Sequence, residues 1–133
     1  MLLLENINHF YTQGSEIINV LNDLYLSSKN GKNIGLIGPS GSGKSTILNI
    51  VGLLEKPRQG VVSINHINCT ELNPEEKTVF RKNNIGYIFQ DNQLLEDFTC
   101  EENVALPLIL NGMRYSEAVK EAQQLLNKLG LDK

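Results

Sequence analysis

The strongest chemical signal in the sequence is a glycine-rich stretch followed by a lysine and two hydroxyl residues. It consists of Gly38, Pro39, Ser40, Gly41, Ser42, Gly43, Lys44, Ser45 and Thr46. Residues 38–45 fit the pattern G-x-x-x-x-G-K-[ST] at every fixed position, and we call them the P-loop. Glycines let backbone N–H groups approach an anion because no Cβ blocks the way. The pattern therefore predicts a site for phosphate groups.

Two side chains of the P-loop have predicted roles in that chemistry. We expect Lys44 to reach the β- and γ-phosphates of a nucleotide, and the Ser45 hydroxyl to supply a Mg²⁺ ligand. A helix that starts at about Gly43 would point its positive end at the anion. The alternative, a surface turn rich in Gly and Ser, is disfavoured because an apolar segment precedes the loop and a helical pattern follows it.

The elements that must position the P-loop are marked by short apolar runs. Residues 33–37 and 85–89 are bounded by turn signals and are typical of strands buried on both faces. Residues 2–7, 17–26 and 61–64 are predicted as further strands, with a loop at 11–15. Helices are predicted directly after the P-loop and at 74–82.

The C-terminal third of the chain is predicted to be helical. Thr99 and Glu102 have the spacing of a capping box at the start of a helix, which Pro107 then limits or kinks. A second helix is predicted with Ser116 as N-cap and Gly130 as stop signal. Its apolar face would comprise Ala118, Ala122, Leu125, Leu126 and Leu129.

Composition narrows the class of protein. Twelve Lys and Arg against fifteen Asp and Glu give 133 residues a net charge of −3, which disfavours nucleic acid as a partner. No apolar run is long enough for a membrane span or a signal peptide. Cys69 and Cys100 are far apart, which suits a reducing compartment, and both are expected to be buried. His9 and His66 are expected at the surface.

Four stretches of the sequence carry a resemblance to a known family. They are Tyr11 to Gly14, GPSGSGKST, LNIVGLLEKPRQG and IGYIFQDNQLLEDFTCEENVALPL. Together they resemble the nucleotide-binding domain of ABC transporters, and within that family the lipoprotein-releasing, macrolide-exporter and cell-division ATPases. The resemblance covers essentially the whole chain.

The resemblance implies an α/β fold of the P-loop NTPase class. Residues 31–59 and 71–95 would belong to a RecA-like core that holds the P-loop. Residues 1–30 and 60–70 would form an antiparallel β subdomain, and residues 96–133 would begin a helical subdomain. The cofactors implied are ATP and Mg²⁺.

The resemblance also assigns roles to residues outside the P-loop. Tyr11 would stack on adenine, although an amphipathic Tyr at a strand end is the simpler alternative. Gln90 would contact Mg²⁺ and the attacking water, and would link the ATP site to a membrane partner. The acidic segment 91–107 would receive that partner, or would simply be a solvated face.

The implied partners are integral-membrane permease subunits and a second ATP-binding subunit. The implied localisation is the cytoplasmic side of the bacterial plasma membrane. The implied function is the export or extraction of a lipophilic substrate such as a lipoprotein. No signature motif, Walker-B carboxylate, catalytic Glu or switch His is found in the sequence. We therefore expect an N-terminal part of the domain that does not hydrolyse ATP alone.

Two other functions are compatible with parts of the sequence. One is a truncated nucleotide-binding module without hydrolysis, and the other is a small-molecule kinase, which the lack of an Arg cluster disfavours. In the family's sheet, further strands lie between segments 33–37 and 85–89. Without them both segments would expose apolar edges, so we expect the chain to unfold below about 45 °C, the lower end for ordinary domains.

Overall fold

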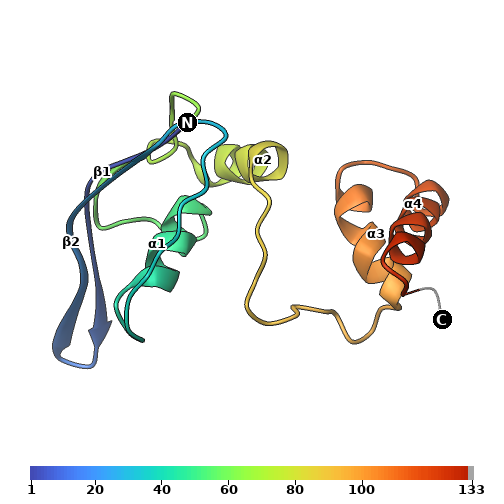
Figure 1. Cartoon of the computed structure of the whole chain (residues 1–133), viewed down its shortest axis with the longest axis horizontal. Coiled ribbons are helices and arrows are strands. Elements are labelled where there is room, and N and C mark those ends of the chain that lie inside the picture. The colour runs from blue at the N-terminus through green and yellow to red at the C-terminus, as the bar shows by residue number, and fades with distance from the viewer. Residues whose placement is uncertain (132–133) are drawn as a thin grey trace. The chain divides into compact units, whose positions relative to one another are not determined.

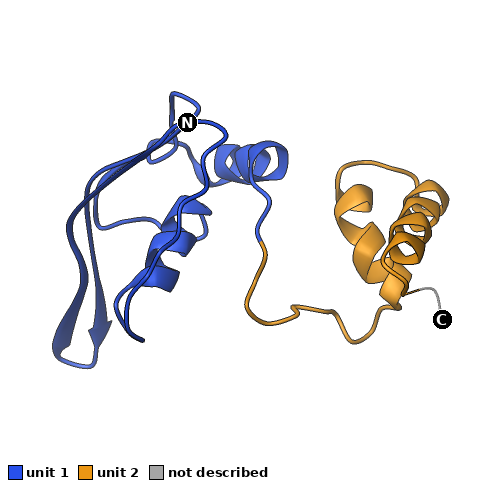
Figure 2. Ribbon diagram, in the orientation of Figure 1, with its two compact units in different colours: residues 1–87 blue, residues 88–133 orange. Residues whose placement is uncertain are grey.

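The computed structural model describes residues 1–131. The chain divides into two compact units, of which unit 1 is Met1–Tyr87 and unit 2 begins at Ile88 (Figure 2). Unit 1 contains the sheet and the P-loop, and unit 2 is helical. Each unit is described by itself below.

The sheet of unit 1 is antiparallel and is built around one long hairpin. Strand β1 (Leu2–Gln13) pairs with β2 (Glu16–Ser28) on one side and with β3 (Gln59–Ile64) on the other. Strand β4 (Ile67–Asn68) pairs with β3, so the order is β2-β1-β3-β4. Figure 1 shows the hairpin of β1 and β2 extending well past the other strands.

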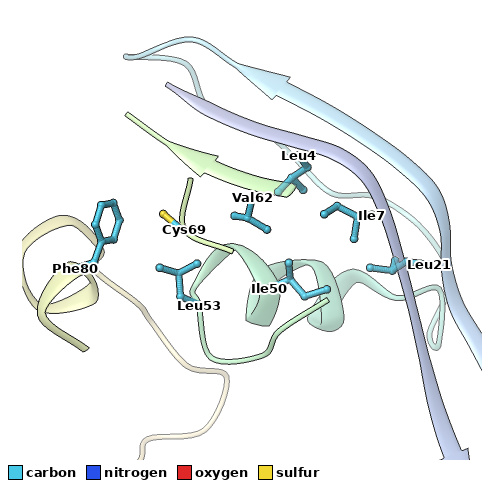
Figure 3. Close-up of a cluster of buried hydrophobic side chains, with 8 residues drawn as sticks. All are labelled: Leu4, Ile7, Leu21, Ile50, Leu53, Val62, Cys69 and Phe80. Atoms are coloured by element: carbon cyan, nitrogen blue, oxygen red, sulfur yellow. The ribbon is translucent and has the colours of Figure 1, made fainter. Parts of the chain in front are cut away.

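One hydrophobic core joins this sheet to the helix that follows the P-loop. Helix α1 (Lys44–Val51) places Ile50 against the sheet, and Leu53 follows directly after the helix (Figure 3). Eight buried residues make up the core: Leu4, Ile7, Leu21, Ile50, Leu53, Val62, Cys69 and Phe80. Because burial of apolar area is the main force that holds elements together, this core fixes α1 relative to β1 and β3.

Helix α2 (Pro74–Asn84) closes the end of unit 1. Its N-cap Asn73 accepts a hydrogen bond from the Glu76 N–H, while the Glu76 carboxylate accepts one from the Asn73 N–H. This capping box satisfies two donors that a helix otherwise leaves unpaired. The side chain of Phe80 on this helix packs in the hydrophobic core.

Unit 2 is a pair of helices with a small core. Helix α3 (Cys100–Leu110) begins with the capping box predicted from Thr99 and Glu102 and contains Pro107. Helix α4 (Tyr115–Lys128) packs on it. The buried core of the pair consists of alanines, Ala105, Ala118 and Ala122, so the two helices approach closely and bury little apolar volume.

Two predicted strands do not form. Residues 33–37 and 85–89 have no strand structure, and Ile37 is 98% and Ile88 97% exposed. Both segments are rich in apolar residues, but a strand also needs a neighbouring strand to satisfy its backbone N–H and C=O groups. Among the described residues neither segment pairs with a strand of the sheet.

Several smaller expectations were also wrong. The predicted loop at 11–15 is largely strand, since β1 runs to Gln13. The N-cap of α4 is Arg114 and not Ser116. Cys100 is exposed, although Cys69 is buried as expected. Two residues of the predicted apolar face are exposed, Leu125 on α4 and Leu129, which is the C-cap of that helix.

Candidate functional site

The P-loop leads from the extended segment 33–37 directly into α1. Gly41 and Gly43 adopt left-handed conformations, with φ of 79° and 83°. At Gly43 a Cβ would also stand 3.0 Å from side-chain carbons of Val20 and of Leu21 on β2. Left-handed φ is costly for residues that carry a Cβ, so the path of this loop favours glycine at both positions.

The start of α1 differs from the starts of α2 and α3. Its N-cap is Gly43, which offers no side chain to accept a hydrogen bond, and its first turn holds no acidic residue. Helices α2 and α3 each have a capping box and two acids in the first turn. The first N–H groups of a helix have no intrahelical acceptor. At α1 these donors, with the positive end of the helix dipole, are left for an external anion.

Lys44 places a positive charge on the same loop. Its Nζ donates hydrogen bonds to the carbonyl oxygens of Gly38 at 2.9 Å and Pro39 at 2.6 Å, and lies 3.4 Å from Ser42 Oγ. The ammonium is therefore folded over the P-loop backbone. An ammonium has three donors and no acceptor, so it can turn from these carbonyls to a phosphate oxygen.

Tyr11, which lies far from the P-loop in sequence, is brought next to α1. Its hydroxyl is 3.3 Å from Thr46 Oγ1 and donates to Glu55 Oε2 at 2.9 Å. The residue is 38% exposed, so Tyr11 remains partly accessible beside the P-loop helix. The structure thus joins Tyr11, Lys44 and Thr46 in one region of unit 1.

Two members of this region, His9 and Glu55, are not among the site residues predicted from the sequence. His9 was expected at the surface and is 3% exposed. Side chains two residues apart on a strand share a face, and Ile7 is fully buried. Strand periodicity counted from Ile7 could therefore have placed His9 inside. No sequence signal marks the contact of Glu55 with Tyr11, because it joins residues far apart in the chain.

The segment before Gln90 is anchored to α1 by Tyr87. The Tyr87 hydroxyl donates to Asn49 Oδ1 at 3.0 Å, and its ring lies so close to Gly52 that a Cβ there would be 2.8 Å away. Gln90 itself is exposed and belongs to unit 2. Its place beside the P-loop stays a prediction.

The start of α1 also offers a hydroxyl oxygen for a metal ion that accompanies a nucleotide. Among residues 1–131 there is no cluster of three or more His, Cys, Asp or Glu side chains able to hold a metal ion. Mg²⁺ bound to a nucleotide needs few protein ligands, because phosphates and waters supply the others. The exposed Ser45 hydroxyl at the start of α1 suits that role. None of the described helices is long and apolar enough to cross a membrane.

Comparison with known proteins places the sequence in a family. A family model described as "ABC transporter" matches residues 21–133. The lipoprotein-releasing system ATP-binding protein LolD of Rickettsia bellii is 46% identical over 135 residues, which cover 100% of this chain and 58% of that protein. LolD 1 of Rhodospirillum rubrum is 39% identical, over 98% of this chain and 58% of the relative. The chain therefore spans a little over half the length of these curated relatives.

Solved structures agree with the sequence comparison. The ATP-binding cassette MJ0796, in a dimeric post-hydrolysis state bound to ADP and Pi, matches with a TM-score of 0.88 and 42% identity. The match covers 96% of this chain and 56% of that one. This chain thus shares the fold of part of a known ATP-binding cassette. The chain belongs to the ABC transporter family, as part of its α/β ATP-binding cassette.

Proposed function

We propose that this chain is the phosphate-binding part of an ATP-binding subunit of the lipoprotein-releasing type. The observation that carries the proposal is the start of α1, where uncapped N–H donors, left-handed glycines and the Lys44 ammonium meet. Such a cradle binds the phosphates of a nucleotide. The high identity to two LolD proteins supports the finer assignment.

Within that function each residue has a distinct task. The backbone from Gly38 to Gly43 would surround the phosphates, Lys44 would neutralise their charge, and Ser45 would hold Mg²⁺. Tyr11 would stack on the base. Gln90 would approach the Mg²⁺ and the attacking water once the nucleotide is bound.

The coupling to a membrane is part of the same proposal. An ATP-binding subunit of this type would pair with a second copy and with permease subunits on the cytoplasmic side of the bacterial plasma membrane. The solved MJ0796 cassette is dimeric, and that supports pairing here. The energy of ATP binding and hydrolysis would then serve the release of lipoproteins.

The proposal is tested by titration of Mg-ATP into the chain, followed by calorimetry. Lys44→Ala removes a charge-assisted hydrogen-bond donor, worth about 1.5–3 kcal/mol, so affinity should fall by roughly tenfold to a hundredfold. Lys56→Ala is the matched control, since it removes an exposed lysine of the same unit. Equal affinity of the Lys44→Ala and unsubstituted chains would contradict the proposal.

Hydrolysis is a separate measurement on the same samples. The chain should show no ATP turnover above the Lys44→Ala blank, because phosphoryl transfer needs a carboxylate and a water-positioning group together with the cradle. Turnover that Lys44→Ala abolishes would show that the residues named here suffice for catalysis. That result would overturn the expected dependence on further residues.

A further inference from the structure

One carboxylate, Glu55, contacts two residues of β1 at once. It follows the end of α1, and its Oε2 accepts the hydrogen bond from the Tyr11 hydroxyl at 2.9 Å. Its other oxygen, Oε1, lies 3.0 Å from Nε2 of His9. His9 and Tyr11 lie on the same face of β1, and their rings meet edge to face with centroids 4.9 Å apart and an interplanar angle of 75°. The three side chains therefore form one connected group.

The group is buried at one end and open at the other. His9 is 3% exposed, the Glu55 side chain is 26% exposed, and Tyr11 is the most accessible of the three. Neither nitrogen of the His9 ring makes a well-aligned hydrogen bond. The imidazole therefore acts on its neighbours through packing and through the close approach of Nε2 to the carboxylate. Tyr11 is thus held by the hydrogen bonds of its hydroxyl and by its ring contact with His9, while the residue stays partly exposed.

The Tyr11 hydroxyl has two partners with opposite effects. The hydrogen bond with Thr46 is the largest influence and lowers the pKa of Tyr11, but burial and the hydrogen bond and charge of Glu55 together raise that pKa above its ordinary value. The hydroxyl therefore stays protonated near neutral pH. It can donate to Glu55 while it accepts from Thr46.

The link to Thr46 connects the group to the phosphate cradle. Thr46 is buried on the first turn of α1 and directly follows Ser45. A Tyr ring whose hydroxyl is fixed both to Thr46 on α1 and to Glu55 beyond the end of that helix has a set distance and orientation relative to the P-loop. Ordering a side chain before the ligand arrives removes part of the entropy cost of binding.

We propose that Glu55 is a positioning residue for the nucleotide base: it holds Tyr11 against Thr46, so that base contact and phosphate cradle keep a fixed spacing. The proposal rests on the proposed ATP-binding function and deepens it. Glu55 itself touches neither base nor phosphate. Its effect should appear only for ligands that carry a base.

The test compares two ligands that share phosphates but differ in the base. Calorimetric titrations use Mg-ATP and Mg-tripolyphosphate with the full chain and its variants. Tyr11→Phe keeps the ring and removes only the hydroxyl, and Glu55→Ala removes the acceptor. Each should raise the dissociation constant of Mg-ATP about threefold to tenfold and leave that of Mg-tripolyphosphate unchanged. The double variant should bind Mg-ATP more tightly than the sum of the two single effects predicts, because both changes break the shared Tyr11–Glu55 hydrogen bond.

The controls separate this proposal from a structural role and from failure of the proposed function. Glu71→Ala removes an exposed carboxylate of the same unit and should change neither constant. If Glu55→Ala weakens both ligands equally, or Tyr11→Phe leaves Mg-ATP affinity unchanged, the positioning role is wrong. If the unsubstituted chain binds neither ligand more tightly than Lys44→Ala does, the proposed function itself has failed.

Discussion

The apolar segment of strand β1 and the apolar segment before the P-loop are similar in residue type but differ in burial. Ile7 on β1 is fully buried, whereas Ile37, one residue before the P-loop, is 98% exposed. On β1, Leu4 lies opposite Leu26 on one side and Val62 on the other. Segment 33–37 has no such neighbour among the described strands. An apolar run becomes a strand only where its backbone partners are supplied.

The same contrast exists at the helix starts. Helices α2 and α3 close their first turns with capping boxes made by their own sequence. Helix α1 begins at a glycine with no side-chain cap. Helix α4 also lacks a side-chain cap, but its first turn holds the acidic Glu117, whereas the first turn of α1 holds no acid.

The largest expected effect comes from a matched pair of isoleucines. Ile50→Ala should cost about 2–5 kcal/mol of unfolding free energy, since it leaves a cavity in the core. Ile37→Ala removes the same atoms from an exposed position and should cost less than about 0.5 kcal/mol. Urea unfolding followed by circular dichroism measures both. Similar losses of unfolding free energy for the two variants would show that the two apolar regions do not differ in burial as described.

The P-loop glycines provide the next largest effect. Gly43→Ala combines left-handed strain with contact against Val20 and Leu21, so it should cost about 1–3 kcal/mol. Gly41→Ala is the matched control, because its φ is also positive but a Cβ would meet nothing within 4 Å. The midpoint of thermal unfolding should be lower for Gly43→Ala than for Gly41→Ala. The reverse order would mean that the loop does not pack on β2 as described.

The caps of unit 2 should have a smaller effect. Thr99→Ala removes the side chain that accepts from the Glu102 N–H and should cost about 1 kcal/mol. Ser116→Ala is the comparison, since Ser116 lies inside α4 and caps nothing; it should be neutral within about 0.5 kcal/mol. Amide exchange of α3 and of α4 reads each helix separately. Equal loss from both substitutions would argue against the observed cap positions.

The smallest effect is a pH dependence of α3. Hydrogen bonds from the Thr99 N–H, the Tyr115 hydroxyl and the Thr99 hydroxyl lower the pKa of Glu102. A lowered carboxyl pKa contributes stability above its ordinary pKa, and this is lost as the pH falls through the lowered value. Protection of α3 amides should therefore decline below about pH 4.3, and Glu102→Gln should flatten that part of the profile. An unchanged profile in Glu102→Gln would assign the decline to another group.

Local signals predicted more of this molecule than long-range contacts did. The P-loop and the Thr99–Glu102 capping box depend on spacing within a few residues, and both were located from sequence. The ABC family and its fold were recognised through such local motifs. The failed strands at 33–37 and 85–89 depend on pairing between distant segments, which periodicity cannot show.

In the candidate site, too, local motifs are predictable from the sequence and contacts between distant residues are not. The roles of Lys44 and Ser45 follow from the local motif and stay predictions, and the structure places Tyr11 beside Thr46. The contact of Glu55 with Tyr11 and His9 arises because β1 and the end of α1 pack on one core. No pattern of residues near Glu55 signals that meeting. The assigned task of Gln90 stays a prediction.

The central claim is that the open start of α1 receives phosphate, and amide hydrogen exchange tests it most directly. Mg-tripolyphosphate should slow exchange of the Lys44, Ser45 and Thr46 amides by at least about tenfold, since these N–H groups lack intrahelical acceptors. The amides at the capped start of α3 should exchange at the same rate with and without the ligand. Unchanged exchange at residues 44–46 would contradict the account. So would equal slowing at the start of α3, or slowing in Lys44→Ala as large as in the unsubstituted chain.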